Sequence, residues 1–145
     1  MAKPDPALLS PARYAFTAEI MTRYADLDTN GHINNVATAI YFEDLRVRFE
    51  HGLGVGDLGD ASPTQVVVAS IQIEYLAEAF YPDPVVGHGA VSRIGSSSWD
   101  IVTLLTQKDV PYAFCKATLV STAEGRPHRL APALQAALER HTLRD

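Results

Sequence analysis

The spacing of apolar residues changes once near the start of the chain. Residues 13–22 partly alternate between apolar and polar, which predicts a first β-strand. Residues 34–50 instead repeat their apolar positions at spacings of three and four, without Pro or Gly, which predicts a helix. Asn34 or Asn35 is the expected N-cap and Gly52 the expected stop.

This predicted helix is apolar on more than one side. A helix at the surface of a globular protein needs only one apolar stripe, facing the core. A sheet or a partner subunit wrapped around several sides of the helix would account for the pattern. The apolar positions are Val36, Ala37, Ala39, Ile40, Tyr41, Phe42, Leu45, Val47 and Phe49.

The remainder of the chain favours β-structure. Four more strands are expected, at residues 65–79, 85–93, 97–107 and 111–121. The connections between the last three are short enough for an antiparallel meander. Residues 52–63 are expected to form a flexible connection, residues 1–12 an extended arm, and residues 131–143 a possible short C-terminal helix.

The order of these elements predicts the fold class. One strand, one helix and four strands form an α+β domain in which an antiparallel five-stranded sheet curls around a single central helix. The 145 residues, 47% of them hydrophobic, suffice for one core, so residues 1–145 are expected to be a single domain.

The composition limits which binding partners and which cellular compartment are expected. The formal net charge is −5, and acidic proteins bind polyanions poorly, so no nucleic acid partner is expected. No apolar run approaches the roughly 20 residues that cross a bilayer, and no signal peptide is evident, so membrane insertion is not expected. Cys115 is the single cysteine, which favours a reducing, cytoplasmic location and a buried position on a strand.

Candidate chemistry is concentrated directly before the helix, where turn-forming residues alone explain part of the pattern. Asp26, Asp28, Asn30 and Gly31 fit the opening of a calcium-binding EF-hand loop. The twelfth position of that loop requires a bidentate Glu, and here it is Ala37. The calcium interpretation is therefore disfavoured.

Two further alternatives use the same acidic residues. Asp26, Asp28 and His32 could ligate a transition metal, but no second cluster of His or Cys completes the shell. An Asp-x-Asp opening after a strand also occurs in aspartyl phosphatases, but these require alternating strands and helices downstream. We therefore expect neither a metal nor another cofactor.

The start of the helix offers a different chemistry. Free N–H groups of its first turn, around residues 31–36, can stabilise an oxyanion, assisted by the helix dipole. A carboxylate just upstream can attack an activated acyl group or activate water, and Gly31 allows a ligand to approach closely. A thioester suits such a site because its carbonyl is electrophilic and its thiolate leaves readily.

These residues also resemble a known family. The motif Arg23-x-x-Asp26-x-Asp28-x-x-Gly31-His32-Ile33-Asn34-Asn35, followed by Tyr41-x-Glu43-x-x-Arg46, closely resembles the signature of 4-hydroxybenzoyl-CoA thioesterase-like hotdog proteins. The similarity extends over nearly the whole chain, including residues 73–75 and 94–98. It implies a hotdog fold and an acyl-CoA thioesterase that needs no cofactor.

The resemblance also implies roles for individual residues. Asp28 matches the catalytic carboxylate, acting as nucleophile or general base, and the backbone N–H of Asn35 matches the group that polarises the carbonyl. Gly31 and His32 match motif positions at the substrate, although the role of His32, like that of Asp26, is more plausibly to shape the loop.

Glu43 is the competing catalytic carboxylate. A related branch of hotdog thioesterases carries its carboxylate on the helix, about two turns after the polarising N–H, and Glu43 follows Asn35 by eight residues. Two turns are roughly 12 Å, too far within one chain but within reach across a dimer of antiparallel helices. An ion pair with Arg46 or Arg48 would instead make Glu43 structural.

The same resemblance implies an acyl-CoA substrate bound between the subunits of a homodimer or homotetramer. By analogy, Ser97 and Ser98 contact the pantetheine arm. Candidate cations for the CoA phosphates are Arg93, Lys108, Lys116, Arg126 and Arg129. The alternatives are an acyl carrier protein thioesterase, a hotdog dehydratase or hydratase, and a non-catalytic module that binds acyl-CoA.

Overall fold

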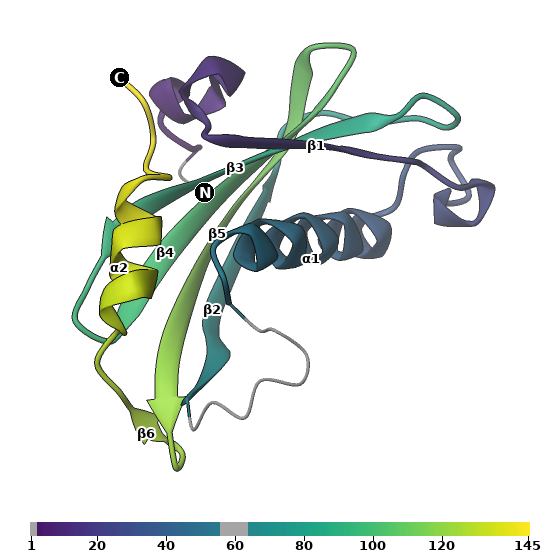
Figure 1. The fold of residues 1–145 in the computed structure, drawn as a ribbon. Coiled ribbons are helices and arrows are strands. Elements are labelled where there is room, and N and C mark those ends of the chain that lie inside the picture. The colour runs from purple at the N-terminus through teal and green to yellow at the C-terminus, as the bar shows by residue number, and fades with distance from the viewer. Residues whose placement is uncertain (1–2, 56–63) are drawn as a thin grey trace.

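A sheet wrapped around one long helix forms the body of the protein (Figure 1). The computed structural model describes residues 3–55 and 64–145. The long elements, in chain order, are β1 (Phe16–Ile20), α1 (Asn35–Gly52), β2 (Thr64–Tyr75), β3 (Val85–Ile94), β4 (Ser98–Gln107), β5 (Val110–Ala123), β6 (Arg126–Pro127) and α2 (Pro132–Glu139). Short 3-10 turns occupy Pro6–Leu9, Pro11–Arg13 and Tyr24–Asp26.

All strand pairs of the sheet are antiparallel, in the order β1-β3-β4-β5-β2. The expected meander of β3, β4 and β5 is confirmed, and β6 adds a two-residue pair to the end of β5. β2 lies at one edge of the sheet, against β5, although it precedes β3 in the chain. The expected α+β hotdog architecture is therefore confirmed, with the small strand β6 added.

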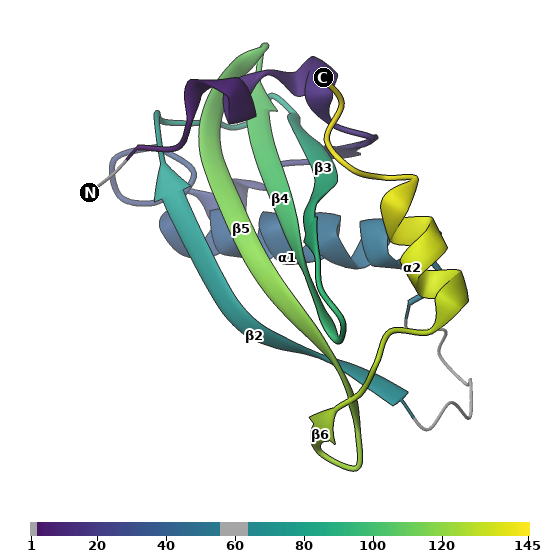
Figure 2. The same ribbon diagram turned by 90° about the vertical axis from the view of Figure 1, so that its left-hand side faces the viewer.

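α1 packs against the concave face of the sheet, where two glycines of β3 make room for it (Figure 2). Leu45 and Phe49 are fully buried on this face of the helix. A Cβ added at Gly87 would lie 2.7 Å from Leu45, and one added at Gly89 would lie 2.5 Å from Phe49. Contacts this short do not occur between packed carbon atoms, so helix and strand approach closely only because these positions lack side chains.

The helix boundaries follow from local chemistry. Asn34 is the N-cap, as expected, and its Oδ1 accepts a hydrogen bond of 2.7 Å from the N–H of Ala37. The helix continues two residues beyond the predicted end, to Gly52.

No described helix is both long and apolar enough to span a bilayer.

The chain termini differ from the expectations. The arm before β1 is not extended, because Asp5 caps a 3-10 turn by accepting from the N–H of Ala7, and Pro11 begins a second turn. Leu8 and Leu9 of this arm pack against the outer face of the sheet. At the other end, α2 stops at Glu139, and the residues after it continue beside β3. The expected flexible connection at residues 52–63 lies mostly outside the described residues.

A buried histidine lies on the outer face of the sheet. His88 is 7% exposed, and its ring nitrogens lie 3.4 Å from the Thr17 hydroxyl and 3.2 Å from the Thr106 hydroxyl. Neither neighbour carries a charge that would stabilise an imidazolium. Burial therefore lowers the pKa of His88, and the ring is neutral at neutral pH in the folded protein.

This burial predicts that His88 contributes less to the stability of the protein in mild acid. Below pH of about 6.5 the unfolded chain binds a proton at His88 more readily than the folded chain does. The stability that neutral His88 contributes is therefore complete above that pH and is lost as the pH falls toward the lowered pKa of the folded state. Denaturant unfolding between pH 7 and 5 should show a decline of at most about 1.4 kcal/mol per pH unit from this group.

His88→Gln should flatten this decline, whereas His128→Gln, at an exposed position, should keep it. Stability curves of wild type and His88→Gln that run parallel over this range would contradict the interpretation. The carboxylates Asp26 and Asp100, whose pKa values are lowered, do not interfere, because they lose their contribution only at lower pH.

Candidate active site

The loop before α1 closes on itself around Asp28. Leu27 pairs with Ile33 as an isolated bridge, and the N–H of Asp28 donates to the carbonyl of His32 over 2.8 Å. Gly31 turns the chain with a φ of +79°, a conformation that favours glycine. The loop thus returns Asp28 to the residues that lead into the helix.

The Asp28 side chain is held by backbone groups of its own loop. Its Oδ1 accepts hydrogen bonds from the N–H groups of Asn30 over 2.8 Å and His32 over 3.0 Å. These bonds, the one from His32 first, lower the pKa of Asp28 below its ordinary value. The carboxylate is exposed and ionised at neutral pH, and no described residue donates to its Oδ2. One carboxylate oxygen is thus positioned and the other is available to a ligand.

Asp26, unlike Asp28, is buried, and both of its carboxylate oxygens are hydrogen-bonded. It is 3% exposed, and its carboxylate accepts from the Tyr41 hydroxyl, from the backbone N–H of Arg23 and from the Arg23 guanidinium. Burial alone would raise the pKa of Asp26, but the bonds from Tyr41 and Arg23 lower it. Its carbonyl also accepts from the N–H of Asn34 over 2.9 Å. Asp26 ties the loop to the helix and has no free oxygen for a substrate.

The first turn of α1 presents unused donors. Asn34 caps the N–H of Ala37, but no acceptor among the described residues faces the N–H of Asn35 or Val36. Asn35 is exposed, and its carbonyl accepts from the Tyr75 hydroxyl of β2 over 3.2 Å. Free N–H groups at the positive end of an 18-residue helix stabilise negative charge on a ligand oxygen.

His32 is turned toward the segment after β2. Its Nε2 lies 3.0 Å from the Glu78 carboxylate, and its ring meets Phe80 edge-on at a centroid distance of 5.3 Å. The N–H of the next residue, Ile33, donates to the carbonyl of Ala79. These contacts give His32 an anchoring position for the loop.

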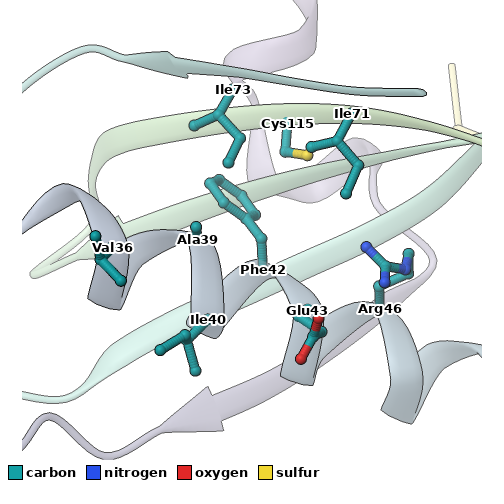
Figure 3. Close-up of a pocket in the computed structure, with 9 residues that line it drawn as sticks. All are labelled: Val36, Ala39, Ile40, Phe42, Glu43, Arg46, Ile71, Ile73 and Cys115. Carbon is teal, nitrogen blue, oxygen red and sulfur yellow. The ribbon is translucent and has the colours of Figure 1, made fainter. Parts of the chain in front are cut away.

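Glu43 lies at a cavity between α1 and the edge of the sheet (Figure 3). The sequence allowed an ion pair with Arg46 or Arg48, and neither pair forms. Arg48 binds Asp44 over 2.6 Å, and Arg46 lies beside Glu50. Glu43 is exposed and has no ion-pair partner among the residues that the structure describes.

The structure does not bring all predicted site residues together. Ser97 and Ser98 lie at the start of β4, whereas the end of β4, at Gln107, hydrogen-bonds Phe80 near the loop. At about 3.4 Å per residue, the ten residues of β4 put the two serines roughly 30 Å from that end. Ser98 instead accepts from Arg93 over 3.0 Å.

The five candidate cations for the CoA phosphates fall into two groups, those with an acidic partner and those without one among the described residues. Arg93 and Lys116 both face the buried Asp100 carboxylate, at 3.0 and 3.6 Å, and Lys108 pairs with Asp83 at 3.2 Å. Arg126 and Arg129 are exposed, and no acidic partner is seen for them in residues 3–55 and 64–145. These two remain the cations most available to a phosphate.

Cys115 is buried on β5, as expected, and its thiol borders the same cavity as Glu43. Burial raises its pKa to about 11, so it is protonated at neutral pH and a poor nucleophile.

Arg46 was not identified from the sequence as a residue of this cavity. Its position between Leu45 and Val47 in an apolar helix was the signal that could have indicated a buried charge.

Comparisons with known proteins agree with this geometry. Residues 22–138 match the family model of the thioesterase-like superfamily. YsmA, an uncharacterized protein of Bacillus subtilis, is 32% identical over 85 residues, which is 59% of this chain and 56% of that protein. The matched stretch therefore spans little more than half of that relative.

Solved structures share the fold along most of their length. One from Bacillus stearothermophilus, described as a predicted thioesterase, is 25% identical with a TM-score of 0.80, over 90% of this chain and 98% of that one. A Thermus thermophilus thioesterase complexed with coenzyme A and Zn is also 25% identical, with a TM-score of 0.74, over 88% and 94% of the two chains.

Proposed function

Because the chain belongs to the thioesterase-like superfamily, we propose that it hydrolyses an acyl-CoA thioester to the free acid and CoA. The observation that carries the proposal is the pairing of two features at one end of α1. An ionised Asp28 carboxylate lies in a closed loop, and the first-turn N–H groups that follow it have no acceptor among the described residues. The solved relative that contains coenzyme A supports CoA as the carrier.

The reaction requires two contributions from these residues. The N–H of Asn35 donates to the thioester oxygen and stabilises the negative charge that develops there. Asp28 accepts a proton from water as the water oxygen bonds to the carbonyl carbon. The C–S bond then breaks, and the thiolate of CoA leaves and takes up a proton. Direct attack by Asp28, giving an anhydride that water then opens, uses the same two groups.

Gly31 contributes space to this arrangement. Apart from its chain neighbours, no described residue has an atom within 4 Å of the position that a Cβ would take at Gly31, so the loop is open on that side. His32 holds the loop through Glu78 and Phe80. We propose that the pantetheine thioester passes over Gly31 to reach Asn35.

A second copy of the chain is part of the proposal. β2 forms an edge of the sheet and exposes a row of apolar side chains, and α1 exposes others next to it. An unpaired edge with this composition favours pairing with an identical strand. The residues are Val36, Ile40, Val47, Val67, Val68, Ile71 and Tyr75. In such a homodimer, or a homotetramer built from it, Glu43 of one copy would approach the helix start of the other.

The test is release of free thiol from a panel of acyl-CoAs that differ in chain length. We expect steady turnover of at least one acyl-CoA. The same acyl groups on acyl carrier protein belong in the panel, because the loop does not distinguish the two carriers. Tight binding of acyl-CoA without any thiol release would contradict hydrolysis and favour the non-catalytic module.

A further inference from the structure

The cavity beside Glu43 is apolar except at one end. Its volume is about 220 Å³, and it lies between α1 and strands β2 and β5. Figure 3 shows Val36 and Arg46 at opposite ends, with the Phe42 ring between them. Ile71 and Ile73 of β2 line the other wall. A cavity of this composition suits a hydrocarbon chain along most of its length.

Arg46 is the exception, and it is buried without being satisfied. Its side chain is 10% exposed, and its Nε has no hydrogen-bond partner. The nearest acidic atom, Oε1 of Glu50, is 3.5 Å away and likewise makes no hydrogen bond. A buried donor that gives up water without gaining a partner is costly, and so it needs an explanation.

A purely structural ion pair does not explain this geometry. Arg48 and Asp44 are also four residues apart on α1, and they close to 2.6 Å at an exposed position. The helix therefore permits a close pair at this spacing. In the buried pair, where a hydrogen bond is worth more, the two groups remain further apart. The guanidinium extends from α1 toward Ile71, over the cavity (Figure 3).

The charges around the cavity limit which polar group a bound ligand can carry. Glu43 lines the cavity and Glu50 lies beside Arg46, so a ligand carboxylate at Arg46 would have acidic side chains nearby as well as one cation. A hydroxyl or keto oxygen accepts from a guanidinium N–H of Arg46 without that repulsion. The other named walls of the cavity are carbon or the protonated Cys115 thiol.

We propose that Arg46 selects acyl groups that carry a neutral oxygen, a hydroxyl or a keto group, by donating a guanidinium N–H to that oxygen. This inference rests on the proposed function, since it names the substrate class of that site. Arg46 follows Asn35 by eleven residues, or roughly 16 Å along the helix axis. Within one copy the recognised oxygen therefore lies far from the thioester, whereas in the proposed dimer, in which Glu43 of one copy approaches the helix start of the other, it would lie closer.

The experiment compares acyl-CoAs of one chain length. kcat/KM is measured for dodecanoyl-CoA, 3-hydroxydodecanoyl-CoA, 12-hydroxydodecanoyl-CoA and dodecanedioyl-CoA, which ends in a carboxylate. Wild type should favour one of the two hydroxyacyl substrates over dodecanoyl-CoA by roughly tenfold or more. Arg46→Met should bring that ratio close to one, whereas the matched variant Arg48→Met should preserve it.

A ratio at or below one in wild type, or an unchanged ratio in Arg46→Met, would overturn the proposal. A strongest preference for the carboxylate would also overturn it, in favour of anion recognition. Because Arg46→Met leaves Glu50 without its neighbour, the double variant Arg46→Met/Glu50→Gln provides a neutral pair if the single variant does not fold.

A binding measurement separates this inference from the proposed function. The rise in melting temperature caused by 12-hydroxydodecanoic or 3-hydroxydodecanoic acid is compared with that caused by dodecanoic acid. A larger rise with a hydroxy acid that disappears in the Arg46 variants supports recognition by Arg46, even if no thioester is hydrolysed. Equal rises in wild type count against it, whatever the turnover.

Discussion

Asp28→Asn is expected to lower kcat for acyl-CoA hydrolysis by roughly 100- to 10,000-fold while the protein stays folded. Asparagine keeps an oxygen in the place of Oδ1, so the N–H groups of Asn30 and His32 retain their acceptor. It removes the negative charge and the ability to take a proton or attack a carbonyl. The loss should therefore fall mainly on kcat, with a small change in KM, and is measured as thiol release under saturating substrate.

The pH dependence sharpens this expectation. Backbone N–H groups hold the pKa of Asp28 below its ordinary value of about 4. The carboxylate is therefore ionised throughout the range from pH 7 to 5. Ionisation of Asp28 should therefore not limit kcat between pH 7 and 5, and its loss should appear only in stronger acid.

Controls assign the effect to the right carboxylate. Asp44→Asn removes an exposed aspartate of α1 that binds Arg48, and it should leave kcat near the wild-type value. Full turnover by Asp28→Asn, together with a large loss in Glu43→Gln, would move the catalytic role to Glu43. Full turnover by both variants would exclude both assignments.

Local chemistry explains why much of the fold was predictable. α1 begins at the expected position because Asn34 caps the helix through a hydrogen bond within three residues. The position of β2 was not predictable in the same way. The strand pairs with β5, whose partner residues follow by 38 to 59 positions, and such pairing depends on contacts that a local pattern does not contain.

In the candidate site, too, the local features were predictable from the sequence and the tertiary contacts were not. Asp28, Gly31 and Asn35 lie within eight residues, so their motif indicated a common loop and helix start. The ion pair of Glu43 with Arg46 or Arg48, which the sequence left open, does not form, and the reason lies in the helix geometry. Arg48 is five residues from Glu43, off its face of the helix, and Arg46 turns to Glu50, four residues further on. The walls opposite Arg46 come from β2 and β5, which only the tertiary fold brings to α1.

Gly89→Ala is expected to lower the free energy of unfolding by about 1–3 kcal/mol, through overpacking between β3 and α1. The new methyl group would lie 2.5 Å and 3.0 Å from two atoms of the Phe49 ring. That ring cannot move aside easily, because Phe16 stacks on it at a centroid distance of 5.3 Å and His141 lies at 6.0 Å. Relief therefore requires that α1 shift away from the sheet, which is measured by denaturant unfolding.

Two other glycines provide a graded comparison for this clash. Gly87→Ala should cost less than Gly89→Ala, because its methyl group meets the terminal methyls of Leu45, which are easier to displace than a ring. Gly52→Ala, at the end of α1, meets no atom within 4 Å among the described residues beyond its chain neighbours and its own helix backbone, and should be neutral or slightly stabilising. The double variant Gly89→Ala/Phe49→Leu should be less destabilised than the sum of its single changes, because leucine leaves room for the added methyl. Additive effects in that pair would show that the clash with Phe49 is not what requires glycine at position 89.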